Sequence, residues 1–220
     1  MCRIFTNGKA PETNRGWRWL NPVTAAIAAR GGVVSKVTKL GSQGPKEPVV
    51  ESLPEGNIYL GTLEMIVSTV ENIVSQGLGK YPVSIFVPNA QWNSLRAFHN
   101  RLQTGTEDPV QEYLENKESG YSDEEQDLWD RFYGASQKIN SLQIHPHPRE
   151  DRKNTLVERA EKEIAQLQEK ENPTRRDKNR LNQLEAQLTV VSMLSAAWEA
   201  TPEPQTGGEV EIEIDDELVI

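Results

Sequence analysis

The sequence predicts an α/β fold in which helices flank a mixed sheet. Three observations support this fold class. Short β-like runs occupy residues 1–60, an amphipathic helical pattern begins at Gly61, and a strand rich in Val, Ile and Phe at 81–89 precedes a second helix. The resulting order of strands, helix, strand, two helices and strand is typical of an α/β domain.

The bulk properties of the chain limit the functions that it can have. Its 220 residues can bury one core and leave room for a second small unit. The net charge of −9 gives no general basic footprint, so nucleic-acid binding would need a local basic face. The one cysteine, Cys2, cannot form an internal disulfide or a cysteine-ligated zinc site, and it fits a reducing compartment.

The sequence gives no sign of a membrane segment or a secretory signal. No apolar run approaches the roughly 20 residues that a membrane-spanning helix needs. The N-terminus lacks the apolar core of a signal peptide. We therefore expect a cytoplasmic protein with no membrane partner.

The first sixty residues contain several predicted strands separated by turns. The β-like runs are CRIFT at 2–6, VVSKVTKL at 33–40 and NIYL at 57–60. TAAIAARGG at 24–32 fits either a strand or a short helix. From Gly61, apolar residues recur every three or four positions, which predicts a helix that ends near Gly77.

The middle of the chain continues with helices and a last core strand. A helix is predicted at 90–102, directly after the strand at 81–89. Residues 103–123 are polar and acidic, and they predict a loop with one helical turn at VQEYL. Ser122, followed by Asp, Glu and Glu, is an N-terminal helix signature. SLQIHPHP at 141–148 is the last predicted core strand.

Two further helical segments predict an antiparallel hairpin. The first, at 153–170, stops at Asn172-Pro173, where Asn caps the next helix and Pro takes its first position. Each helix carries one apolar stripe, formed by Leu156, Ala160, Ile164 and Leu167 and by Leu181, Leu184, Leu188 and Val191. The stripes are predicted to pack on each other or on the domain, and a coiled-coil interface with a partner is the alternative.

The chain is therefore predicted to have three parts. Residues 1–170 form the α/β domain, residues 171–200 form a C-terminal helix that packs back as a hairpin, and residues 201–220 form a linker and an acidic tail. In the tail, acidic residues alternate with Val210, Ile212 and Ile214. The tail fits a solvated acidic segment, and its alternation fits an added edge strand.

Five segments in this order resemble the successive motifs of the ribonuclease H type 1 family. They are IFTNG, TLEMIVSTVENIV, VSIFVPNAQWNSL, DLWDRF and IHPHPREDRKNTLVERAEKEI. The resemblance covers about residues 1–170 and implies a ribonuclease H-like mixed five-stranded sheet with flanking helices. It implies that Asn7 and Asn89 stand where the family carries catalytic Asp, and that Glu64 and Glu158 stand at its two other acidic positions. The family's loop histidine would be His147 or, less favoured, His145.

The family's chemistry explains why these positions matter. In the family that the chain resembles, two Mg²⁺ ions activate a water and stabilise the leaving oxygen of phosphodiester hydrolysis. Mg²⁺ needs anionic oxygen ligands, and two of the four carboxylates are replaced by amides here. The resemblance therefore implies Glu64 and Glu158 as the remaining metal ligands, Mg²⁺ or Mn²⁺ as a weakly held cofactor, and impaired hydrolysis.

Other interpretations of these residues stay open. Asn7 and Asn89 also fit ordinary strand-end residues that tolerate turn geometry. A shifted alignment would bring Glu150 or Asp151 into the site. Another possibility is that Asp was deliberately changed to Asn to disable the enzyme.

The sequence supports three candidate functions, the first two through the resemblance and the third through the hairpin and tail. The first is a catalytically impaired protein that binds an RNA/DNA hybrid or another duplex through Lys9, Arg15, Trp92, Asn93, Arg96, Arg149, Arg152 and Lys153. Trp92 is equally suited to the core. The second is an active hybrid-cleaving ribonuclease that uses an unrecognised acid. The third is an adaptor that binds a protein through the hairpin and residues 209–220, which loosely resemble the C-terminal tips of single-strand-binding proteins.

Overall fold

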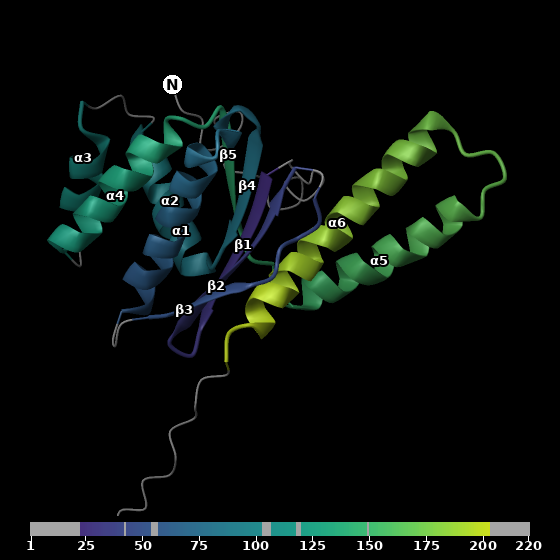
Figure 1. The fold of residues 1–220 in the computed structure, drawn as a ribbon, viewed down its shortest axis with the longest axis horizontal. Helices are drawn as coiled ribbons and strands as arrows, with labels where there is room; N and C mark the ends of the chain where they lie inside the picture. Colours follow the sequence, from purple (N-terminus) through teal and green to yellow (C-terminus); the bar gives the residue numbers. More distant parts are fainter. Residues whose placement is uncertain are drawn as a thin grey trace, which may run out of the picture.

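The computed structural model describes residues 23–41, 43–53, 57–102, 107–117, 120–148 and 150–202. Within them a five-stranded mixed sheet lies between two layers of helices (Figure 1). The predicted α/β fold class with a mixed sheet is thereby confirmed.

The sheet has three antiparallel strands on one side and two added parallel strands on the other. The strands are β1 (Val23–Arg30), β2 (Val33–Leu40), β3 (Val49–Ser52), β4 (Pro82–Val87) and β5 (Ser141–Pro146). Their order across the sheet is β3-β2-β1-β4-β5. β2 pairs antiparallel with both β1 and β3, whereas β4 pairs parallel with both β1 and β5. The carboxyl ends of β1, β4 and β5 therefore point toward the same edge.

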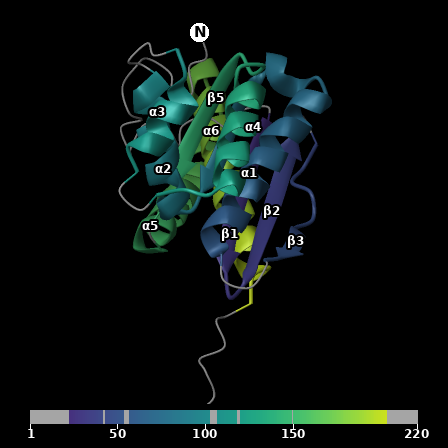
Figure 2. The same cartoon turned by 90° about the vertical axis from the view of Figure 1, so that its left-hand side faces the viewer.

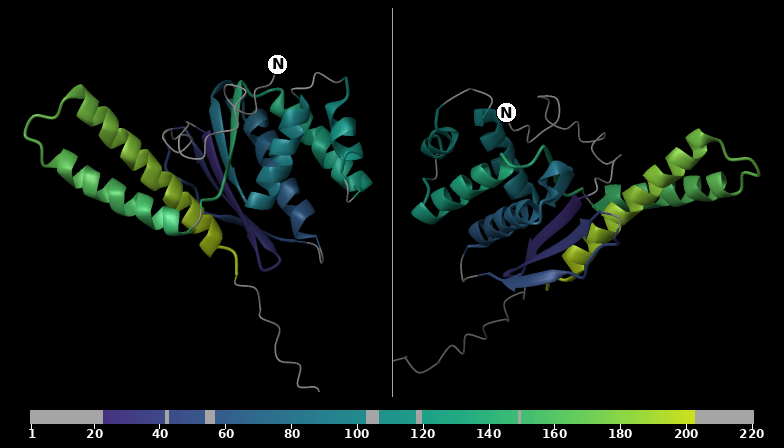
Figure 3. Two further views of the ribbon diagram at one scale, coloured as in Figure 1. Left: turned by 180° about the vertical axis from the view of Figure 1, so that it is seen from behind. Right: turned by 45° about the horizontal axis from the view of Figure 1, so that its top comes forward.

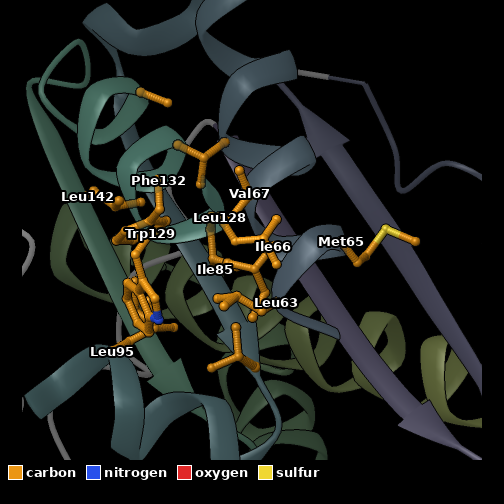
Figure 4. Close-up of a cluster of buried hydrophobic side chains, with 14 of the residues drawn as sticks. Leu63, Met65, Ile66, Val67, Ile85, Leu95, Leu128, Trp129, Phe132 and Leu142 are labelled. Carbon is orange, nitrogen blue, oxygen red and sulfur yellow. The ribbon is translucent and has the colours of Figure 1, made fainter. Parts of the chain in front are cut away.

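One face of the sheet carries the main hydrophobic core. The helices on this face are α1 (Ile58–Ser75), α2 (Asn89–Leu102), α3 (Pro109–Glu115) and α4 (Asp123–Ser136). Figure 2 shows α1 and α4 in front of the strands and α6 behind them. In Figure 4, Ile66 of α1 lies with Leu128 and Phe132 of α4 near Ile85 of β4, and all four side chains are buried. Phe98 of α2 adds edge contacts with the aromatic rings of α3 and α4.

The opposite face is covered by the last helix, α6 (Arg175–Glu199). A second buried cluster joins Ala26, Ala28, Val37 and Phe86 of the sheet to Val190, Met193, Leu194 and Ala197 of α6. The preceding helix, α5 (Glu150–Gln168), packs along α6. The first part of α6 and the facing end of α5 project away from the sheet as a hairpin (Figures 1 and 3).

Several local predictions are confirmed. Residues 33–40 form β2 with the predicted bounds. The ambiguous TAAIAAR segment is a strand, β1. The Ser122 hydroxyl accepts a hydrogen bond from Glu125 N and caps α4 as predicted. The predicted helical turn at VQEYL is the short helix α3, which Asp108 caps.

Two local predictions are wrong, and one strand was not predicted. NIYL is not a strand, because the Asn57 side chain accepts a hydrogen bond from Leu60 N and starts α1 three residues before Gly61. β3 was not predicted, because its four residues follow a Gly- and Pro-bearing turn and have no buried face. The cap of α6 is Thr174 rather than Asn172, because Thr174 and Asp177 form a reciprocal capping box.

Candidate functional site

The carboxyl edge of the parallel strands brings together part of the predicted site. The backbone N–H of His147, the first residue after β5, donates to the carbonyl of Val87, the last residue of β4, at 3.0 Å. Asn89 follows two residues after Val87 and is the first residue of α2. Because the carboxyl ends of parallel strands are common ligand sites in α/β proteins, this edge is the candidate functional site.

The first turns of α2 present polar side chains at this edge. Asn89, Asn93 and Arg96 are exposed, and their spacing of four and three residues places them on one helical face. The Arg96 guanidinium lies 5.4 Å from the centre of the Trp92 ring, within cation–π range. The ring packs partly against the main core. Trp92 is therefore anchored in the core and contacts a surface cation, and its role as a nucleic-acid contact stays a prediction.

His147 is held in the neutral form. Burial lowers its pKa to about 4, hydrogen bonding with the backbone of Ile27 and Phe86 partly opposes this, and the charge of Lys153 lowers the pKa further. Its Nε2 is buried and has no hydrogen-bond partner in the described part of the chain. At neutral pH the ring can therefore accept a proton or hydrogen bond but carries no positive charge.

His145, the less favoured candidate, is a core residue. Its ring stacks on Phe86 with the ring centres 4.9 Å apart, and it is buried beneath the α6 layer. Burial lowers its pKa to about 4. These contacts give His145 a packing role.

The structure places Glu64 in an ion-pair cluster on the outer surface of α1 and α4. Both of its carboxylate oxygens accept from Arg131, through Nη1 and Nη2 at 3.1 Å each. The same guanidinium donates to Glu71 at 3.1 and 2.9 Å, and Asp127 lies 3.6 Å from it. Hydrogen bonding from Arg131 lowers the pKa of Glu71. The Glu64 carboxylate thus already has a cationic partner.

Glu158 lies in the other layer. It is exposed on α5, which packs on α6 on the far side of the sheet from α1. The two predicted metal ligands are therefore not brought together. Among the residues that the structure describes, no group of three or more His, Cys, Asp or Glu side chains could hold a metal ion. These residues do not fit the predicted Mg²⁺ or Mn²⁺ site.

The other predicted contacts are only partly described. Asn7, Lys9, Arg15 and Arg149 lie outside the described residues. Arg152 belongs to α5, but its side chain is also outside the description, and Lys153 is half-buried near His147.

The predicted strand at 2–6 is outside the described residues as well, and β1 occupies the position beside β4. β1 and β4 run in parallel register, with Ala26 opposite Phe86. Continuing that register brings Ala28 and Ala29 level with Pro88 and Asn89, just beyond the end of β4. Neither alanine can supply a carboxylate there.

Two polar clusters were missed by the sequence analysis. Arg131 joins α4 to α1 across 67 sequence positions, and the only local signal was the i,i+4 spacing of Asp127 and Arg131. Glu125 is buried at the start of α4 and accepts from Lys117 Nζ at 2.5 Å and from Tyr59 Oη and Trp129 Nε1 at 3.3 Å each. No pattern in the sequence marks Glu125 as buried among its acidic neighbours.

No family model, curated protein sequence or solved structure matches the chain. Within the described ranges, none of the helices has the length and apolar character that crossing a membrane requires.

Proposed function

We propose that the chain is a ribonuclease H-like protein that binds an RNA/DNA hybrid or a related duplex and has lost the family's metal-dependent hydrolysis. The strand order carries this proposal. Three antiparallel strands precede the first helix, and two parallel strands follow in the order β3-β2-β1-β4-β5. That order is consistent with the arrangement that the resemblance implies.

The surface at the carboxyl edge supports the binding part of the proposal. Asn89, Asn93 and Arg96 give amide and guanidinium donors along one face of α2. Lys153 lies at the start of α5 near the same edge. Such donors suit phosphate oxygens, which carry most of the affinity and little of the sequence specificity in duplex binding.

The positions of the acidic residues support the proposed loss of hydrolysis. Arg131 pairs with Glu64, Glu158 lies in the opposite layer, and the β1 residues level with Pro88 and Asn89, just beyond β4, are alanines. A two-metal mechanism needs several carboxylates around one point. The described residues supply no such group.

Reversing the charge of Arg96 is expected to weaken hybrid binding. At low salt Arg96→Glu should lower the affinity by roughly tenfold and reduce the slope of log affinity against log salt by about 1, because a phosphate contact is lost. Titration of a fluorescent RNA/DNA hybrid at several salt concentrations measures both quantities.

Lys138→Glu is the matched control for this prediction. Lys138 is exposed two residues after α4, near Gly79 at the opposite end of the parallel strands. Lys138→Glu therefore reverses a positive charge, as Arg96→Glu does, but far from the candidate edge. Equal effects of the two variants, or salt-insensitive binding by the unaltered chain, would contradict the proposed interface.

We expect no cleavage of a labelled hybrid with Mg²⁺ or Mn²⁺, even at high protein concentration. The variant that combines Asn7→Asp and Asn89→Asp should also be inactive, because Arg131 still holds Glu64 and β1 occupies the position beside β4. Product formation by the unaltered chain would establish the active-ribonuclease alternative. Activity in the double variant alone would show that Asn7 reaches the site and that the loss of two charges had disabled it.

A further inference from the structure

β3 is an edge strand that leaves apolar side chains uncovered. It pairs with β2 along one side, and its position at the end of the sheet leaves the other side free among the described residues. All four of its residues are exposed, with Val49 at 50% and Val50 at 47%. Alternate residues of such a strand direct backbone N–H and C=O groups outward, which favours the addition of another strand.

The end of α6 is anchored close to this edge. The Ser35 hydroxyl donates to the Ala197 carbonyl, and Ser35 of β2 is directly opposite Val50 of β3. Val50 therefore lies on the face of the sheet that α6 covers, because directly opposed residues share a face. Figures 1 and 3 show the end of α6 beside β3 from different directions.

A second contact fixes where the chain leaves α6. Arg30 Nη2 donates to the Thr201 carbonyl at 2.9 Å, and the Arg30 guanidinium lies 4.6 Å from the centre of the Trp198 ring. Arg30 pairs with Val33, and Val33 pairs with Ser52. Arg30, Val33 and Ser52 therefore lie side by side across β1, β2 and β3. The chain leaves α6 next to Arg30, level with Ser52, the last residue of β3.

The sequence beyond this exit has the length and pattern of a strand for the free edge. Residues 203–208 can span up to about 20 Å when extended. Crossing from β1 to a position beyond β3 covers three strand spacings, or about 14 Å. Val210, Ile212 and Ile214 then alternate with Glu209, Glu211 and Glu213, which is the period of a strand with one apolar face.

We propose that the segment 209–214 of the same molecule pairs with β3 as an additional antiparallel strand. It enters at the Ser52 end and runs toward Val49, which makes the pairing antiparallel. Val210, Ile212 and Ile214 lie on the face of Val50 and Trp198, both of which are otherwise exposed. The glutamates lie on the other face, where the half-buried Lys36 stands opposite Val49. The proposal is independent of nucleic-acid binding.

Cysteine cross-linking tests the pairing and its face. In a Cys2→Ser background, Val50→Cys is combined in turn with Val210→Cys, Ile212→Cys and Ile214→Cys. Glu211→Cys and Glu213→Cys, each combined with Val50→Cys, are the controls. Opposed strand residues lie within disulfide distance. Mild oxidation should give a cross-linked monomer with at least one of the first three variants, and less cross-linking with the controls.

The remaining cross-linking outcomes would overturn the proposal. A disulfide-linked dimer would make a second copy the occupant of the edge. Absence of a cross-link in all five variants would show that the segment does not pair with β3. Equal yields at apolar and acidic positions would show that it passes β3 without a fixed face.

Hydrogen exchange tests the same pairing without introduced cysteines. The outward amides of β3 should exchange roughly tenfold faster after deletion of residues 203–220, which corresponds to the loss of about one net hydrogen bond for each amide. Ile212→Pro should have the same effect because proline removes a donor and distorts the strand. Val219→Pro, beyond the segment, is the control and should leave the exchange of β3 unchanged. Unchanged exchange after the deletion would overturn the proposal.

Discussion

Lowering the pH from 6.5 to 5 is expected to lower the free energy of unfolding by about 3 kcal/mol. His145 and His147 both have their pKa lowered to about 4 by burial. In the unfolded chain they take up protons near pH 6.5, whereas in the folded chain they stay neutral until about pH 4. The unfolded state therefore binds more protons in this window, and stability is lost as the pH falls.

Urea unfolding at closely spaced pH values between 7 and 5 measures this loss. The carboxylates with lowered pKa, such as Glu71 and Glu163, titrate below the window. His99 is also buried, and burial lowers its pKa, so its contribution has the same sign. His145→Leu removes one of the two main groups and should roughly halve the dependence. Stability that stays constant from pH 6.5 to 5 would contradict the burial of both rings.

For these two histidines, the sequence predicted the strand segment that carries them but not the protonation state of their rings. SLQIHPHP was predicted as the last core strand, and its first six residues, Ser141–Pro146, form β5. The assignment of His147 as the preferred site histidine rested on the resemblance, and the structure does place it at the carboxyl edge beside Val87. Its neutral state depends on Ile27, Phe86 and Lys153 from other elements, so no local pattern could have predicted it.

Local patterns were sufficient wherever one element determines its own structure. The valines of β2 lie between glycines, and Ser122 precedes three acids, so strand and cap were both predicted correctly. β3 was not predicted, because its four exposed residues have no buried face and therefore no alternation of apolar and polar residues. Its existence depends on pairing with β2, which sequence periodicity does not report.

The two acids predicted as metal ligands, Glu64 and Glu158, do not meet in the described part of the chain, for a different reason. Glu64 was placed correctly on an amphipathic helix, but its partner could not be predicted from that helix. Arg131 lies 67 positions away and holds both carboxylate oxygens. Which carboxylates meet depends on the packing of α1 against α4 and of α5 against α6, and this packing is a property of the fold.

Replacing Glu125 by glutamine is expected to lower the free energy of unfolding by about 3 kcal/mol. Glu125 is 5% exposed and joins α4 to α1 and to the segment after α3, because Lys117, Tyr59 and Trp129 all donate to the same oxygen. An amide oxygen can still accept from Tyr59 and Trp129, but it cannot balance the charge of Lys117. The loss should appear as a lower urea midpoint with an unchanged m-value.

Glu124→Gln is the matched control, because it makes the same chemical change one residue earlier on the exposed side of α4. Its expected cost is below about 1 kcal/mol, from the weaker interaction with the helix N-terminus. Adding Lys117→Met to Glu125→Gln should recover much of the loss, since the half-buried cation that Glu125→Gln leaves unpaired is also removed. Equal losses of stability in Glu124→Gln and Glu125→Gln would show that the Lys117–Glu125 pair contributes no more than a surface ion pair. The same conclusion would follow if the loss in the double variant equalled the sum of the losses from Glu125→Gln and Lys117→Met alone.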